Sequence, residues 1–248
     1  MRSAYNGVNW VQFPAVLLYC KKMNYNNLDD VIIFDDVIPE TYQDWLLSYV
    51  KRDDITWSRK DFAISDLPEH KNDPRNGFAN FIKLYQIDGV LDLKNFEEHG
   101  IKKESSNLKE FFMPLVFYFV EKLKINFLIR MRINAVPVMG TNLIQLPHVD
   151  NHYPTSWNII YYLNDTDGDT IIYNEKAHNE EEVIHMTYKD DWTIKKRISP
   201  KKGRAVAFKG NLFHSSSLPT TQPRFVVNIN VCENFNHIHL DKNRINYV

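Results

Sequence analysis

Hydrophobic and polar residues follow two different periods along the chain, and the first part has the period of helices. Val31–Phe34 is a short apolar run rich in β-branched residues, which is typical of a buried strand. After it, Pro39-Glu40 is a favourable helix start, and apolar side chains recur from Tyr42 to Val50 at the spacing of one helical face. This pattern predicts a strand followed by an amphipathic helix that packs on a sheet.

A second helical face runs from Leu108 to Leu123. Pro114 falls within it, so the helix either bends at that residue or becomes regular only near Met113. Between the two helices, residues 53–90 contain prolines, a glycine and scattered charges, and we expect a mostly irregular stretch with a short strand near 81–85. A loop of this length on an enzyme often contacts substrate.

From Phe127 onward the period changes to two. Ile129, Met131, Ile133 and Ala135 alternate with Arg130, Arg132 and Asn134, as expected of a strand with one apolar face. Further strand candidates, separated by turn-forming residues, are 158–163, 170–173, 183–188, 192–198, 204–209 and 224–231. Many short strands after a helical first third predict a mainly β, α+β fold: an antiparallel jelly-roll barrel buttressed by helices.

Composition and charge narrow the class of protein. The 248 residues are 44% hydrophobic, enough for a full core in one domain. The formal net charge of −1 provides no basic field for nucleic acid, so we expect a specific pocket to recognise the ligand. Nothing in the sequence defines an oligomeric state.

The two cysteines, Cys20 and Cys232, are too few for a disulfide scaffold and favour a reducing compartment. The apolar run Trp10–Cys20 is interrupted by Gln12 and Pro14, and no cleavage site of small residues follows it. We therefore expect a cytoplasmic protein that is not secreted and has no membrane partner. Residues 1–30 are expected to form a loosely ordered extension, and either Met1 or Met23 could be the biological start.

The candidate chemistry lies in His148-Val149-Asp150, read together with His214. Two imidazoles and one carboxylate form the facial set that holds non-haem Fe(II) and leaves coordination positions open. Two other pairs have the same spacing but poorer surroundings. His239-Leu240-Asp241 has no later histidine to complete it, and His178-Asn179-Glu180 lies among charged residues that favour a solvated hairpin tip.

Several ordered motifs resemble one family. They are His148–Asn151, Ile160–Asn164, Pro200–Arg204 leading to Phe208 and His214, and finally Arg224. Together they resemble the Fe(II)- and 2-oxoglutarate-dependent oxygenases, above all the prolyl-hydroxylase-like branch and its compact phage-encoded members. The likeness covers residues 127–232 and extends weakly back to 31–50.

The resemblance implies a double-stranded β-helix with His148, Asp150 and His214 as catalytic iron ligands. It places His148 and Asp150 at the end of the second core strand and His214 on the seventh. Arg224 would pair with the distal carboxylate of 2-oxoglutarate, a task suited to a bidentate guanidinium, and Tyr162 would donate to the same carboxylate. A pocket tyrosine of the relatives is replaced by Val136, and Arg132, Asn134 and Val136 share one strand face, which makes them candidate substrate contacts.

The resemblance therefore implies a dioxygenase that uses Fe(II), 2-oxoglutarate and O2 to hydroxylate an aliphatic carbon and releases succinate and CO2. A prolyl residue in a peptide or protein is the leading substrate. The single oxygenase domain would span 31–248, with helical support at 31–126, the barrel core at 127–232 and a tail at 233–248. The alternatives are a nucleic-acid demethylase, which the near-neutral charge disfavours, and a non-catalytic cupin-like binding module, which would not need all four site residues.

Overall fold

A computed structural model describes residues 29–55, 57–63, 68, 71–83, 90–94, 98–99, 109–151, 155–186 and 189–233 of the chain. The fold is mainly antiparallel β with few helices, as the sequence predicted. In chain order the elements are β1 Val31–Phe34, α1 Glu40–Val50, β2 Ser58–Ala63, β3 Gly77–Lys83, β4 Val90–Asp92, β5 Glu98–His99, α2 Lys109–Leu123, β6 Phe127–Val136, β7 Ser156–Tyr162, β8 Thr170–Lys176, α3 Glu180–Met186, β9 Ile194–Ile198, β10 Ala205–Lys209, β11 Leu212–Ser216 and β12 Arg224–Cys232.

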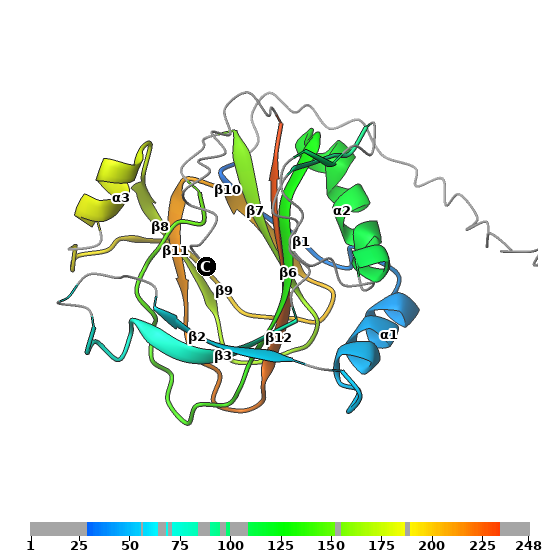
Figure 1. The fold of residues 1–248 in the computed structure, drawn as a ribbon, viewed down its shortest axis with the longest axis horizontal. Helices are drawn as coiled ribbons and strands as arrows, with labels where there is room; N and C mark the ends of the chain where they lie inside the picture. The colour runs from blue at the N-terminus through cyan, green and yellow to red at the C-terminus, as the bar shows by residue number, and fades with distance from the viewer. Residues whose placement is uncertain are drawn as a thin grey trace, which may run out of the picture.

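Two antiparallel sheets face each other across the barrel interior (Figure 1). The larger sheet has the strand order β1-β10-β7-β12-β6-β3-β2, with β4 joined to β6 and to β5. The smaller sheet has the order β11-β8-β9. Neighbours in the sheets are far apart in sequence, so residues from distant segments meet on the inner faces.

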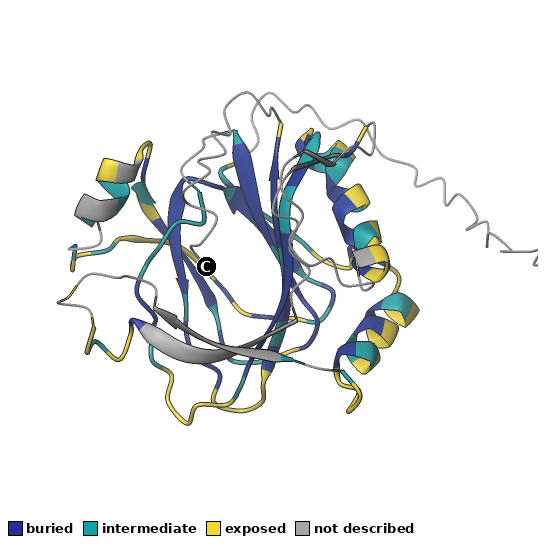
Figure 2. Ribbon diagram, viewed as in Figure 1, coloured by how far each residue is buried: buried dark blue, intermediate teal, exposed yellow. Residues whose placement is uncertain are grey.

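The alternation along β12 decides which face of the larger sheet receives which side chains. Val227, Ile229 and Val231 belong to the core between the sheet and the helices α1 and α2, which also contains Leu46, Phe112 and Phe119. The intervening positions, Arg224, Val226, Asn228 and Asn230, point into the barrel. Figure 2 shows the same division: the central strands β6, β7 and β12 are mostly dark blue, while α1 and α2 are exposed on their outer sides.

The barrel interior combines an apolar cluster with a polar wall. Tyr162, Phe208, Leu212 and Val226 pack together with residues of both sheets. The polar wall lies on β6, β12 and β7, where Arg130, Asn230 and Asn158 stand side by side in the strand register. Polar side chains inside a barrel indicate that this part serves a ligand rather than the core.

One local prediction was wrong, and two others were met only in part. Residues 183–188 were expected to be a strand, but Glu180–Met186 is helix α3. In the stretch 53–90, the short strand expected near 81–85 corresponds to β3, which pairs with β6 through Ile82 and Asn134, whereas β2 was not expected. Of the two alternatives for the second helix, a regular start only near Met113 is wrong: helix α2 begins at Lys109 and runs through Pro114.

Some predictions fall on other parts of the chain. The extension at 1–28, most of the tail at 233–248 and the pair His239/Asp241 lie outside the described residues. Among the described residues, no helix is both long enough and apolar enough to cross a membrane.

Candidate metal and co-substrate site

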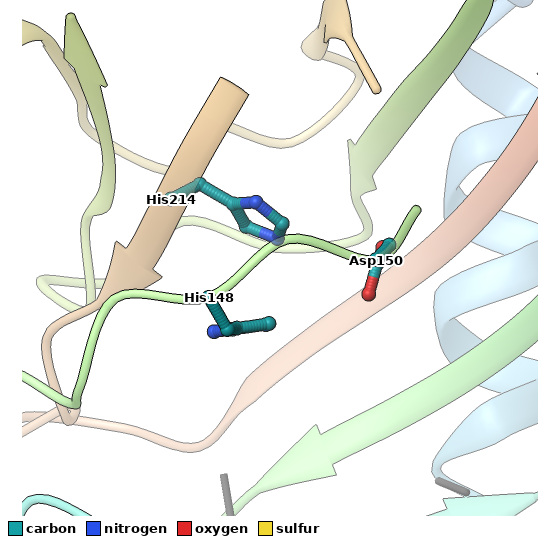
Figure 3. Close-up of side chains that lie close together, drawn as sticks. All are labelled: His148, Asp150 and His214. Atoms are coloured by element: carbon teal, nitrogen blue, oxygen red, sulfur yellow. The ribbon is translucent and has the colours of Figure 1, made fainter. Parts of the chain in front are cut away.

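His148 and His214 come from different parts of the chain and are held opposite each other by their own backbones. His148 lies outside the named strands, in an isolated antiparallel bridge with His214 of β11. The resemblance predicted that His148 lies at the end of a core strand. In the structure, that part of the strand is present only as this single bridge. The two rings lie 4.4 Å apart between centroids and face a common space with Asp150 (Figure 3).

The three side chains can hold one metal ion. One ligand atom from each of His148, Asp150 and His214 lies within 4.8 Å of the others. The Nδ1 atoms of His148 and His214 each lie 3.4 Å from a backbone carbonyl, of Leu146 and Leu212 respectively. A carbonyl can only accept, so Nδ1 would carry the proton and Nε2 would be free to bind a metal.

Asp150 is oriented by a network of side chains, since it is not part of a sheet strand. Arg130 Nη2 lies 3.0 Å from its Oδ1, and Asn230 Nδ2 donates to its Oδ2 at 3.0 Å. Arg130 Nε in turn donates to Asn230 Oδ1 at 2.8 Å, which closes a ring of three residues. Asn230 also donates to Asn158 Oδ1 at 2.7 Å. Arg130 and Asn230, which lie side by side on β6 and β12, therefore fix both carboxylate oxygens of Asp150.

The protonation states suit a metal site. Burial lowers the pKa of the His214 imidazole to about 3, and the neighbouring His148 adds to the shift. Burial also lowers the pKa of His148, against the opposing effect of Asp150. Burial raises the pKa of Asp150, but Arg130 and the two imidazoles outweigh it and keep that pKa well below its usual range. Near neutral pH the site thus offers two neutral imidazoles and a carboxylate.

Arg224 is a buried guanidinium deep in the barrel. Its Nη1 donates to the carbonyl of Gly168 at 2.9 Å, and its Nη2 donates to Ser216 Oγ at 3.0 Å. Its Nε is buried without a hydrogen-bond partner, and within the described residues no carboxylate forms a salt bridge with Arg224. Burial lowers its pKa. An unneutralised buried cation of this kind fits an anionic ligand.

The other predicted site residues lie on the same inner surface. Tyr162 is fully buried and its hydroxyl donates to Thr170 Oγ1 at 2.7 Å, while burial raises its pKa to about 12. Val136 lies opposite Arg224 in the strand register, and Asn134 lies opposite Val226. Arg132 is 5% exposed and lies opposite Asn228. Along the paired strands it lies between the pair Val136/Arg224 and the pair Arg130/Asn230, whose side chains contact Asp150.

Sequence reasoning missed the residues that support these groups. Arg130, Asn230 and Asn158 orient Asp150, and Ser216 holds Arg224. Their only sequence signal was a polar residue at every second position of a strand. The competing pair was correctly set aside: His178 is exposed, and the only described cluster that could hold a metal is the one at His148.

The comparisons with known proteins agree with this donor set. Residues 137–232 match the family model described as the 2OG-Fe(II) oxygenase superfamily. None of the curated proteins matches the chain in sequence.

Solved structures are similar in fold. One is a 2OG-Fe(II) oxygenase family oxidoreductase from Burkholderia pseudomallei, 8% identical, with a TM-score of 0.53 over 83% of this chain and 86% of that one. Another is the non-haem alpha-ketoglutarate-dependent epimerase SnoN from nogalamycin biosynthesis, 9% identical, with a TM-score of 0.56 over 83% and 79%. A Trichoplax adhaerens prolyl hydroxylase with a peptide fragment is 12% identical over 82% and 84%, but its TM-score of 0.49 is too low to bear on the substrate.

Proposed function

We propose that this chain, whose residues 137–232 match the 2OG-Fe(II) oxygenase superfamily model, is such an oxygenase and hydroxylates an unactivated aliphatic carbon, most simply of a prolyl residue in a peptide or protein. The superfamily works with Fe(II), 2-oxoglutarate and O2. The observation that carries the proposal is the meeting of His148, Asp150 and His214 in a barrel that also buries the guanidinium of Arg224.

Each of these residues has one task. His148 and His214 would hold Fe(II) through Nε2, and Asp150 would add a carboxylate whose orientation is set by Arg130 and Asn230. Arg224 would pair with the distal carboxylate of 2-oxoglutarate, with Tyr162 and Ser216 beside it. When bound, iron and 2-oxoglutarate together convert O2 and a C–H bond into an alcohol, with succinate and CO2 as the other products.

The protein supplies position and a shielded space. The apolar cluster of Phe208, Leu212 and Val226 would exclude water from the barrel interior. This would strengthen the attraction between Arg224 and the distal carboxylate of 2-oxoglutarate. The location in the cytoplasm and the single domain over 31–248 are further parts of this proposal.

The prolyl substrate rests on the likeness of the strand Tyr161–Asn164 and the run His148–Asn151 to prolyl hydroxylases. A binding module without catalysis is the weaker candidate, since it has no use for a metal triad together with Arg224. A nucleic-acid demethylase is also weaker, because the net charge of −1 provides no basic groove.

One experiment tests the enzyme class and the residue roles together. Fe(II) and then 2-oxoglutarate are added without oxygen to the purified protein, and the visible charge-transfer band of the chelate is recorded. The band should appear in the wild type, be absent in His214→Ala and require more 2-oxoglutarate in Arg224→Gln. A folded wild-type protein without the band would favour the binding module.

A further inference from the structure

Two hydrogen-bond donors inside the barrel are buried and have no acceptor within the described part of the chain. They are Nε2 of Gln145 and Nε of Arg224. Gln145 is 4% and Arg224 is 7% exposed, so solvent reaches neither side chain well. Both atoms can only donate, so neither can satisfy the other. Buried donors without an acceptor are costly, which indicates that a ligand with acceptor atoms completes them.

Ser216 connects these two side chains and fixes the orientation of the Gln145 amide. Arg224 Nη2 donates to Ser216 Oγ at 3.0 Å, and Ser216 Oγ donates to Gln145 Oε1. Because the hydroxyl already accepts from the guanidinium, its own proton needs an acceptor, and of the two amide atoms only the oxygen can serve. Oε1 of Gln145 therefore faces Ser216, and the two N–H groups of Nε2 face away from it.

The edge of Arg224 that carries Nε and Nη2 suits a carboxylate. The same edge of Arg204 binds both carboxylate oxygens of Asp35, at 2.7 and 3.2 Å. On the other side of Arg224, Nη1 already donates to two main-chain carbonyls. The charge of Asp169 acts on Arg224 as well, but its carboxylate pairs with Arg197 at 2.5 Å and leaves Nε of Arg224 without an acceptor.

The strand register places these groups one level of the barrel away from the triad. His214 and Ser216 are consecutive inward residues of β11, roughly 7 Å apart at about 3.4 Å per residue. Ser216 pairs with Thr170 of β8, whose Oγ1 accepts from the hydroxyl of Tyr162. Polar side chains from several strands thus gather at the level of Ser216, and their spacing from His214 suits a short dicarboxylate.

We propose that Gln145 is a specificity-determining residue of the co-substrate site, and that its Nε2 donates to the same distal carboxylate of 2-oxoglutarate that Arg224 binds. This rests on the proposed function and adds to it a residue that the resemblance did not indicate. The site selects a 2-oxo acid with a second carboxylate, because an apolar end would leave the donors of Gln145 and Arg224 unsatisfied.

The test compares 2-oxoglutarate with 2-oxopentanoate, which has a methyl group in place of the distal carboxylate. Protein loaded with Fe(II) and kept free of oxygen is titrated with each acid, and calorimetry measures both affinities. Gln145→Met, which removes the donors at similar size, should weaken 2-oxoglutarate about tenfold, the value of a hydrogen bond to a charged group, and change 2-oxopentanoate less than about twofold. Gln222→Met, the same change at an exposed glutamine, is the control and should alter neither affinity.

A double-mutant cycle separates a direct contact from an effect through Ser216. If Gln145 meets the carboxylate, Gln145→Met should weaken 2-oxoglutarate by about fivefold or more even in a Ser216→Ala protein, because the donor is lost there too. Gln145→Glu is the second variant if Gln145→Met does not fold, since it has the same shape and keeps an acceptor for Ser216. It should weaken 2-oxoglutarate still more, because two carboxylates would meet.

The outcomes distinguish this inference from the proposed function. An unchanged affinity of Gln145→Met or Gln145→Glu for 2-oxoglutarate overturns the inference and leaves the proposed function intact. So does an equal loss for both acids, or no further loss in the Ser216→Ala protein, since Gln145 would then act only through the fold or through Ser216. A wild-type protein that binds both acids equally, or neither, contradicts the co-substrate itself, and the proposed function then fails together with the inference.

Discussion

His148 and His214 exchange both of their backbone hydrogen bonds, each N–H donating to the other's carbonyl at 2.9 Å. This pair fixes two imidazoles on the inner surface without a continuous strand on the side of His148. The positions of the rings therefore depend on the main chain, and the side chains can be removed without removing the bridge.

The first prediction follows from that independence. His148→Ala, Asp150→Ala and His214→Ala should each keep the far-ultraviolet circular dichroism of the wild type and lose metal binding, on the order of 100-fold or more, since each removes one of three ligands. Calorimetry with Fe(II) or Co(II) measures this. His178→Ala, which alters the exposed pair of the same spacing, is the control. Wild-type affinity in any of the three would remove that residue from the site.

The second prediction concerns variants that should weaken binding of 2-oxoglutarate and leave metal binding unchanged. Arg224→Gln leaves the distal carboxylate without its counter-charge in a buried pocket, a penalty of about 2–5 kcal/mol, so the 2-oxoglutarate requirement should rise by a factor of tens or more. Tyr162→Phe should have a milder effect of the same kind. Metal affinity without 2-oxoglutarate should change little in both. A large loss of metal in Arg224→Gln would contradict this assignment.

The sequence alone was sufficient for the parts of the fold that depend on local patterns. The alternation from Phe127 predicted β6, and the motif of His148, Asp150 and His214 predicted three side chains that lie close together. The error at 183–188 was avoidable. Asn179 Oδ1 accepts from the N–H of Glu182, and Asn179 Nδ2 donates to Glu182 Oε1, so Asn-x-x-Glu caps α3 much as a capping box does.

The remaining features depend on strand register, which no local pattern specifies. Arg130 and Asn230 both looked like polar positions of half-exposed strands, and only the pairing of β6 with β12 sets them opposite each other and next to Asp150. The same holds for β2, which becomes a strand because it pairs with β3. Tertiary pairing decided the structure in both cases.

The third prediction concerns pH. The pKa of His214 is about 3 in the folded protein and about 6.5 in an unfolded chain, so between these values the unfolded state binds more protons and stability falls as pH is lowered. For the metal-free protein this group alone should cost about 2 kcal/mol between pH 7 and pH 5. Urea unfolding at the two pH values measures it. The loss should shrink in His214→Gln and persist in His178→Gln; an unchanged loss in His214→Gln would contradict the buried neutral imidazole.

The fourth prediction concerns the turn between β10 and β11. A Cβ at Gly210 would overlap Ser156 Oγ and lie 2.5 Å from Asn151 Oδ1, in the segment that follows Asp150. Gly210→Ala should therefore destabilise the fold by about 1–3 kcal/mol and weaken metal binding as well, because Asn151 must move. Gly140→Ala is the comparison: its Cβ meets nothing within 4 Å, although its φ of +67° carries the ordinary cost for alanine, about 1 kcal/mol. Equal metal affinity in Gly210→Ala and wild type would mean that this turn does not influence the metal site.

The last prediction concerns Ser216, which the sequence did not single out. Ser216 Oγ accepts from Arg224 Nη2 and also donates to Gln145 Oε1, so it ties the guanidinium to the segment that leads to His148. Ser216→Ala should raise the 2-oxoglutarate requirement by a factor of about 5, the value of one hydrogen bond of roughly 1 kcal/mol, and leave metal affinity unchanged. Ser217→Ala is the matched control, since Ser217 Oγ accepts from the N–H of Asp169 and does not contact Arg224.

A double-mutant cycle distinguishes positioning from a direct contact with the co-substrate. If Ser216 acts only by holding Arg224, its removal should have no further effect on 2-oxoglutarate binding in an Arg224→Gln protein, and the two changes should be far from additive. Full additivity would mean that Ser216 meets 2-oxoglutarate itself. In that case the guanidinium would be positioned by the carbonyls of Gly168 and Asp169, which accept from its Nη1 at 2.9 and 3.5 Å. Because these carbonyls belong to the main chain, Ser216→Ala should then leave the guanidinium in place, and the higher 2-oxoglutarate requirement would reflect the lost contact of Ser216 with 2-oxoglutarate alone.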